Sequence, residues 1–235
     1  MPSTGRRNDG QIPLAALLGL FAASGAAALV YEVLWLKELG RIFGVTAYAA
    51  ATTLGVFFLG LALGGLVWGR RAERIEQPLK TYAVLEIGIA FWALVYLLLL
   101  DLYRELQGPL FGAIGYRPAL LRGVKVLLAC GILLVPSFLM GGTLPVMAQY
   151  LVRRRSQLGT RATLLYAFNT IGAAVGALSA GFVLPRLLGF RGSYVVAIAL
   201  NLLVALIAWR WRARVPAEAD PAEAGPAAKT RAAAA

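Results

Sequence analysis

Long apolar stretches, separated by short polar clusters, make up most of the chain. An α-helix needs about 20 apolar residues to cross the hydrocarbon core of a bilayer. Six stretches meet that length, so the pattern predicts an all-α integral membrane protein with six transmembrane helices. The predicted spans are 12–36, 46–68, 79–100, 120–140, 163–184 and 193–211.

The same pattern divides the chain into three parts. A cytoplasmic N-terminal segment, 1–11, precedes a transmembrane domain, 12–211, and a tail rich in Ala, Pro and Glu, 212–235, follows it. The tail has no apolar period and is expected to be disordered. The fourth stretch stays apolar beyond its predicted end, through 141–145, which leaves open whether its helix breaks there.

Composition narrows the class of protein. Hydrophobic residues make up 60% of the chain and charged residues 14%, which excludes a disordered chain, a fibrous repeat and an ordinary cytosolic enzyme. The single cysteine and the absence of histidine exclude a disulfide framework within the chain, and they predict neither a metal site nor a cofactor.

The net charge of +12 comes from basic clusters between the apolar stretches, which is typical of loops that flank membrane spans rather than of nucleic-acid binding. Before the tail, thirteen Lys and Arg residues fall on the N-terminal side of the predicted membrane and eight on the other side. This bias predicts an inner-membrane protein with both termini in the cytoplasm. Two clusters are expected to contact anionic lipid headgroups. They are Arg70, Arg71, Arg153, Arg154 and Arg155.

Small residues recur every four positions in the second and fifth stretches, a spacing that lets helix backbones approach closely in lipid. The expected helix-packing positions are Gly60, Gly64, Gly65, Gly69, Gly172 and Gly176. We expect these faces to pack within the chain, and the alternative is an interface with a protein partner or a second copy. The two stretches occupy equivalent positions if the chain consists of two three-helix repeats.

Two resemblances follow from short segments. The basic loop 65–74 resembles the loop between helices two and three of the major facilitator superfamily, except that Gly69 stands where that family usually has an aspartate. The resemblance implies half of a major facilitator fold, built as a 3+3 repeat. The segment 24–35 resembles the opening helix of the membrane-bound spermidine synthase-like proteins, and 60–64, 140–145 and 165–172 fit the same family.

That second family joins a facilitator-like membrane portion to a soluble aminopropyltransferase domain. Such a domain would bring a glycine-rich cofactor loop and several aspartates for the cationic substrate. The chain has only Asp9, Asp101 and Asp220, none in that setting, and no set of nucleophile and base can be assembled. We therefore do not expect the chain to be an enzyme by itself.

Polar residues inside the predicted spans are the candidate sites for a cation or substrate, because a charge within the bilayer is costly and usually faces the protein interior or water. The candidates are Glu32, Glu86, Tyr31, Trp35 and Asn169. Glu32 has aromatic neighbours that suit a cation, and its structural alternative is a helix-end ion pair with Lys37 nearby. Glu86 is expected to face the bundle interior, with Lys80 as one possible ionic partner.

Three functions remain compatible with the residues. The chain is a membrane module that anchors or carries small cations or polyamines, an accessory subunit of a larger membrane complex, or a small homodimeric transporter. The lipid bilayer is the expected environment in each case.

Overall fold

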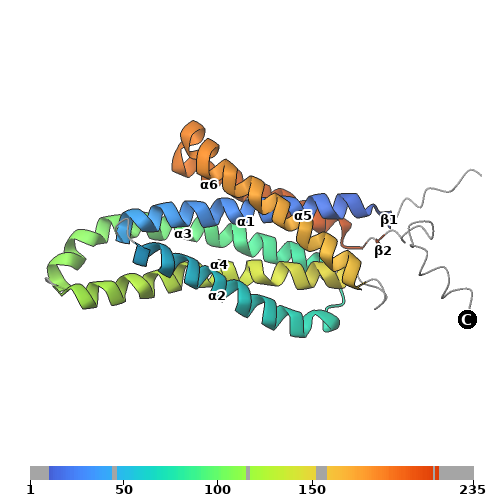
Figure 1. The fold of residues 1–235 in the computed structure, drawn as a ribbon, viewed down its shortest axis with the longest axis horizontal. Coiled ribbons are helices and arrows are strands. Elements are labelled where there is room, and N and C mark those ends of the chain that lie inside the picture. Colours follow the sequence, from blue (N-terminus) through green and yellow to red (C-terminus); the bar gives the residue numbers. More distant parts are fainter. Residues whose placement is uncertain (1–10, 44–46, 115–116, 152–157, 214, 217–235) are drawn as a thin grey trace, which may run out of the picture.

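The computed structural model describes residues 11–43, 47–114, 117–151, 158–213 and 215–216, and nearly all of them are helical (Figure 1). The long helices are α1 (Leu14–Phe43), α2 (Ala47–Arg71), α3 (Pro78–Ile114), α4 (Pro118–Leu151), α5 (Leu158–Leu178) and α6 (Leu184–Trp211). The short elements are the 3₁₀ turn η1 (Ala72–Arg74), the π-helical segment η3 (Ser179–Val183), and strands β1 (Gln11–Ile12) and β2 (Val215–Pro216). Long helices satisfy their backbone hydrogen bonds internally, as a membrane interior requires.

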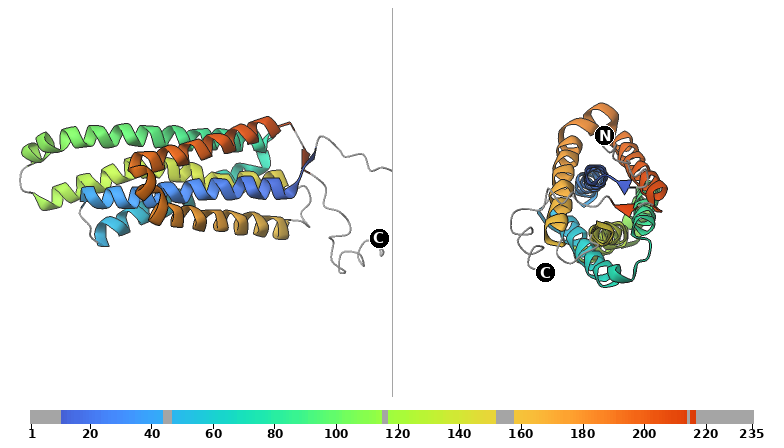
Figure 2. Two further views of the ribbon diagram at one scale, coloured as in Figure 1. Left: turned by 90° about the horizontal axis from the view of Figure 1, so that it is seen from above. Right: turned by 90° about the vertical axis from the view of Figure 1, so that its right-hand side faces the viewer.

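Five helical stretches among the described residues are long and apolar enough to cross a membrane. The fifth, Gly159–Trp211, combines α5, η3 and α6 and has 53 residues, about 80 Å as one straight helix against a hydrocarbon core of about 30 Å. The chain instead turns back on itself around η3 and Gly189, so that α5 and α6 form the two arms of a hairpin (Figures 1 and 2). Gly189 has a φ of 69°, a backbone conformation that glycine adopts without steric cost.

Two helix boundaries differ from those predicted from apolar length. Helix α1 continues to Phe43, so Lys37, Glu38 and Arg41, beyond the predicted end of the span 12–36, lie on its last turns. Helix α4 runs unbroken through 141–145, and its candidate span is Cys130–Leu151, further along the chain than 120–140. Apolar length alone could not place this span, because α4 is longer than a bilayer is thick and much of it is apolar.

Helix packing follows a pattern that repeats between the first and second halves of the chain. Helix α2 packs on α4 as α5 packs on α1, α3 contacts α4 as α6 contacts α1, and α3 lies against α6. Exchanging α1 with α4, α2 with α5 and α3 with α6 leaves this set of pairs unchanged. Helices α2 and α5 hardly touch each other. Both helices lie at the front of the molecule in Figure 1, and we call this side the α2–α5 face.

Glycines allow the closest helix contacts. A Cβ at Gly176 would overlap the backbone carbonyl of Ala26 on α1, and a Cβ at Gly64 would overlap that of Phe138 on α4. One turn earlier, Gly172 approaches the backbone carbonyl of Ala22 on α1 in the same way, and a Cβ at Gly60 would overlap the Ser137 side chain on α4. The two glycine-rich faces predicted from the sequence therefore contact helices of the same chain.

The parallel pair of β1 and β2 joins the chain before α1 to the chain after α6, with Gln11 opposite Val215 and Ile12 opposite Pro216. Ile12 is buried. The first and last described residues therefore lie at the same end of the bundle (Figure 1).

Candidate functional site

Glu86 lies in the middle of the bundle, where three helices meet. Its side chain on α3 is fully buried, with an exposed fraction of 0%. The Ser24 hydroxyl on α1 donates a hydrogen bond of 2.5 Å to Glu86 Oε1, and the Asn201 side-chain amide on α6 donates one to Oε2. Glu86 thus faces the interior, as its depth in the span predicts. Its hydrogen-bond donors are uncharged side chains, and none of the salt bridges among the described residues includes Glu86 or its expected ionic partner Lys80.

Five aromatic side chains pack together beside this point, and we call them the aromatic cluster. They are Tyr31, Trp35, Phe57, Tyr96 and Tyr194. They come from α1, α2, α3 and α6, and the rings of Tyr31 and Trp35 stack with their centroids 5.7 Å apart. The Tyr31 hydroxyl and Trp35 Nε1 are buried and have no hydrogen-bond partner among the described residues. The two aromatic residues predicted as site candidates therefore lie together in the core.

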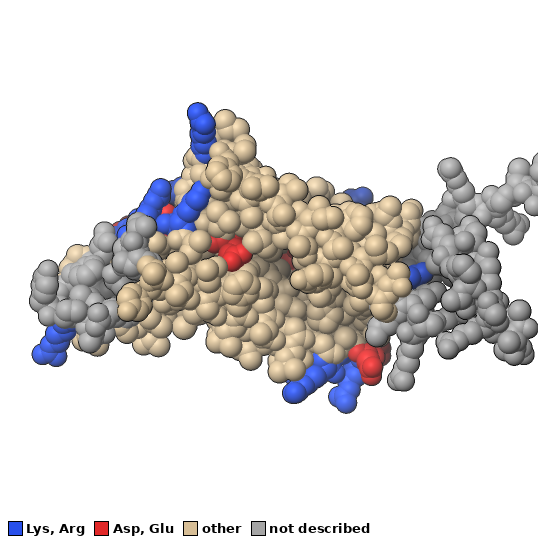
Figure 3. All heavy atoms as spheres, in the orientation of Figure 1, with Lys and Arg blue, Asp and Glu red and all other residues tan. Residues whose placement is uncertain are grey.

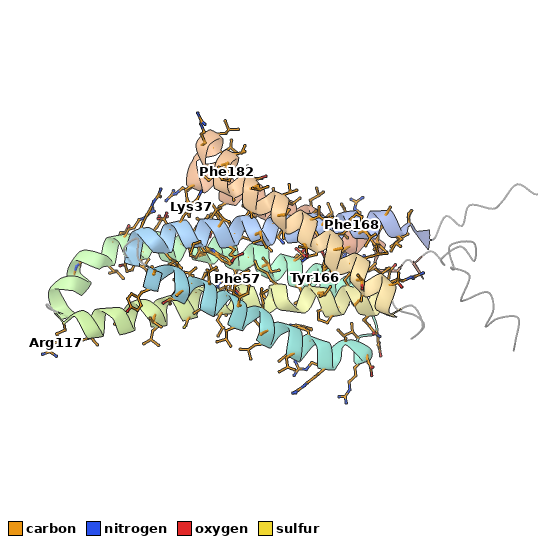
Figure 4. All side chains as sticks on the ribbon, in the orientation of Figure 1. Lys37, Phe57, Arg117, Tyr166, Phe168 and Phe182 are labelled. Atoms are coloured by element: carbon orange, nitrogen blue, oxygen red, sulfur yellow. The ribbon has the colours of Figure 1, made fainter. Side chains whose placement is uncertain are left out.

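Glu32 differs from Glu86 in both accessibility and partners. Its side chain is 8% exposed, and no hydrogen bond or ion pair to it is present in the described part of the chain. The predicted alternative, an ion pair with Lys37, is not formed. The Lys37 ammonium instead donates hydrogen bonds of 2.9 and 3.0 Å to the carbonyls of Ala180 and Gly181 in η3, and Figure 4 shows Lys37 close to that turn.

The position of Glu32 on α1 can be read from its helical neighbours. Gly25, two turns earlier on the same side of α1, lies against Asn169 of α5. Trp35, one turn later, contacts Phe57 of α2, with ring centroids 6.4 Å apart. Glu32 therefore lies between the parts of α1 that contact α2 and α5. Figure 3 shows acidic atoms at the surface in the otherwise uncharged middle of this side of the molecule.

A network of charged residues at the opposite end of the bundle from β1 and β2 was not among the predicted sites. Glu38 on α1 is 3% exposed and pairs with Arg104 on α3 at 2.5 Å and with Arg41 at 3.2 Å. Asp101 on α3 accepts two hydrogen bonds from Arg191 on α6, of 2.7 and 2.8 Å. The only signal in the sequence is the i,i+3 spacing of opposite charges in Glu38–Arg41 and Asp101–Arg104, which does not reveal the pairing between helices.

The remaining predicted residues lie at the ends and faces of the bundle. Arg70 and Arg71 are exposed at the last turn of α2, where basic side chains can meet lipid headgroups, and 153–155 lie outside the described residues. Figure 3 shows most basic side chains toward the ends and edges of this face, while most of its middle consists of uncharged residues. Gly65 makes ordinary contact with α4, and nothing lies within 4 Å of a Cβ built on Gly69. An interface between these glycine faces and a protein partner or a second copy stays a prediction.

These features define a multi-pass α-helical membrane protein with buried polar groups in its core. Residues 16–234 match the family model described as Major Facilitator Superfamily, and the chain belongs to that family. The family and the apolar helices indicate a membrane transporter-like function. Comparison with curated proteins gave no match, and comparison with solved structures gave none either.

Proposed function

We propose that the protein carries a small organic cation across the membrane and that the Glu32 carboxylate receives its charge. The observation that supports this proposal is the state of Glu32: a residue that is 8% exposed, on a helix long and apolar enough to span a membrane, whose carboxyl group has no hydrogen-bond or ionic partner among the described residues. A charged side chain at such a depth costs at least about 3 kcal/mol, so its retention favours a functional role.

The surroundings of Glu32 suit a cation. Trp35 and Tyr31 lie near it in sequence on the same helix and belong to the buried aromatic cluster, and aromatic rings close to a cation attract it through the ring quadrupole. Glu86 does not fit this role as well, because its two carboxylate oxygens already accept hydrogen bonds from Ser24 and Asn201. We assign Glu86 to holding α1, α3 and α6 together.

The proposed architecture is six crossings arranged as two three-helix repeats. The exchange-symmetric set of helix contacts supports it, as does the hairpin formed by α5 and α6. A 3+3 repeat is one way in which membrane carriers build a binding site near the bilayer midplane. Glu32 on α1 lies between the middle and the end of the span Leu14–Arg41.

A polyamine is the finer version of this proposal. It rests on the resemblance of 24–35, which includes Glu32, to the spermidine synthase-like membrane proteins. In that version the protein binds spermidine or a related amine, and any transferase chemistry comes from another polypeptide.

Glu32→Gln is expected to weaken cation binding at least about tenfold, because the amide keeps the shape of the side chain and removes the charge that pairs with the ligand. Binding and uptake of labelled organic cations would be measured with the protein reconstituted in vesicles. Glu105→Gln is the matched control, since Glu105 is an exposed carboxyl at the end of α3. Equal uptake by wild type and Glu32→Gln would contradict the assignment.

The orientation is testable with single cysteines in a Cys130→Ala background. We expect a cysteine at position 74, in the basic turn after α2, to react only from the cytoplasm, and one at Arg117, at the tip of the α3–α4 hairpin in Figure 4, only from the periplasm. A membrane-impermeant maleimide added to intact cells or to inverted vesicles distinguishes the sides. Labelling of both positions from one side would contradict the proposed crossings between them.

A further inference from the structure

An open groove lies at the start of α3, away from the core. It has a volume of about 420 Å³ and lies where α2 ends and α3 begins, at the same end of the bundle as β1 and β2 (Figure 1). Small-molecule sites in proteins have volumes of roughly 300–1,000 Å³, so the groove is large enough for the polar part of a ligand. Its lining residues are Ile75, Glu76, Gln77, Lys80, Thr81 and Val84.

Two opposite charges line this groove, and neither is paired. Glu76 and Lys80 take part in none of the salt bridges among the described residues. The side chains of Gln77 and Thr81 likewise have no hydrogen bond within the part of the chain that the structure describes. A ligand with one positive and one negative group can pair with both charges, whereas an ion of one sign would pair with one of them and be repelled by the other.

The groove lies at the depth of lipid headgroups. The candidate membrane span of α3 begins at Pro78, so Glu76 lies just before the span and Lys80 lies in its first turn. Four helical residues, about 6 Å, separate Lys80 from Val84. The headgroup layer on each side of a bilayer is roughly 5–8 Å thick. The polar end of the groove is therefore placed among headgroups, and its apolar end at the beginning of the hydrocarbon core.

Exposed apolar side chains continue from the groove along α3. They recur at intervals of three and four residues, which places them in one row on the helix, and each is at least 45% exposed. The row rises about 21 Å, more than the roughly 15 Å of hydrocarbon in one leaflet. An acyl chain attached to a headgroup in the groove can therefore follow this row. Its members are Val84, Ile87, Phe91, Leu94 and Leu98.

We propose that the groove binds one phospholipid whose headgroup carries a free ammonium group, such as phosphatidylethanolamine. The lipid ammonium donates hydrogen bonds to the Glu76 carboxylate, and the Lys80 ammonium donates to the lipid phosphate, with Gln77 and Thr81 as further donors. The acyl chain follows the row that starts at Val84. This site is separate from the proposed cation site and does not depend on the proposed function.

The test is a competition among phosphatidylethanolamine, phosphatidylcholine and phosphatidylglycerol with identical acyl chains. Equal amounts are added to the purified, delipidated full chain in mild detergent, and native mass spectrometry identifies the lipid in the singly lipidated protein. We expect at least about threefold more phosphatidylethanolamine than either competitor, because choline has no N–H to donate and glycerol has no positive charge. Excess glycerophosphoethanolamine, which lacks acyl chains, should not displace the lipid.

Variants test each half of the headgroup. Glu76→Gln is expected to remove the preference for phosphatidylethanolamine over phosphatidylcholine, because the amide keeps the size of the side chain and loses its charge. Lys80→Gln should reduce retention of all three lipids at least about threefold, since all three carry the phosphate. Glu73→Gln and Arg71→Gln are the matched controls and should keep the preference, because both residues are exposed charges close by that do not line the groove.

Three results would contradict the proposal. The first is equal retention of the three lipids, or a preference that neither Glu76→Gln nor Lys80→Gln changes. The second is a preference for phosphatidylglycerol that falls with Arg71→Gln, which would show general attraction of anionic headgroups in place of a site. The third is displacement by glycerophosphoethanolamine, which would make the ligand a soluble amino phosphate rather than a lipid.

Discussion

Gly176→Leu is expected to prevent the protein from accumulating in a folded form. The added Cβ would overlap the carbonyl of Ala26, which belongs to the backbone of α1 and cannot rotate away. Overpacking against flexible side chains costs about 1–3 kcal/mol, and here the obstacle is main chain, so we expect a loss of at least about 3 kcal/mol. Because α5 is held mainly by α1, separating them detaches one arm of the α5–α6 hairpin.

The measurement is the monodisperse yield after extraction in mild detergent, followed by thermal unfolding of any folded fraction. Gly159→Leu is the control on the same helix, because nothing lies within 4 Å of a Cβ at that position. Gly64→Leu should behave like Gly176→Leu, and Gly69→Leu like the control. If Gly176→Leu folds normally but an oligomer dissociates, the glycine faces a partner and the contact with α1 is not the one that holds the helix.

Glu86→Ala is expected to lower the free energy of unfolding by about 1–3 kcal/mol, since it leaves the Ser24 hydroxyl and the Asn201 amide buried without an acceptor. Glu86→Gln should cost less, about 1 kcal/mol or below. The Asn201 Oδ1 atom has no partner among the described residues, so rotation of that amide can accept a hydrogen bond from the new glutamine. The more decisive expectation is that Glu86→Ala lowers the free energy of unfolding more than Glu86→Gln does.

Unfolding by increasing mole fractions of a denaturing detergent, followed by tryptophan fluorescence, would measure both. A double-mutant cycle with Asn201→Ala should give a coupling free energy of about 1 kcal/mol, because hydrogen bonds between membrane helices are worth less than buried ones in water. Equal stability of the alanine and glutamine variants, with no coupling to Asn201, would remove Glu86 from the contacts that hold α1, α3 and α6 together.

Because Glu86 and Glu32 are assigned different roles, variants of the two residues should have opposite effects on stability and on cation binding. Glu86 variants should change stability and leave cation binding to the folded fraction intact. Glu32→Gln should do the reverse, because Glu32 has no partner in the described part of the chain to lose. Measuring stability and binding on both purified variants distinguishes a structural carboxylate from a ligand-binding one.

Several features of this protein follow from the sequence alone. Apolar length and charge placement predict a multi-pass helical membrane protein, because backbone hydrogen bonding in lipid leaves a long apolar chain little choice but a helix. The four-residue spacing of glycines predicts close helix contacts, and the depth of Glu86 predicts its burial. These inferences depend only on the local sequence, because the bilayer selects apolar helices and disfavours exposed charges whatever the tertiary structure is.

Pairing between helices was decided only by the tertiary structure. Apolar helices are similar in composition, so the sequence could not show that Gly176 meets Ala26 or that Gly64 meets Phe138. The partners of Glu86 are Ser24 and Asn201, 62 and 115 residues away, and neutral donors carry no charge pattern that would reveal them. The sequence likewise could not distinguish the two carboxylates. Glu86 on α3 accepts hydrogen bonds from α1 and α6, whereas Glu32 on α1 has no partner among the described residues, and only the packing of the helices decides this difference.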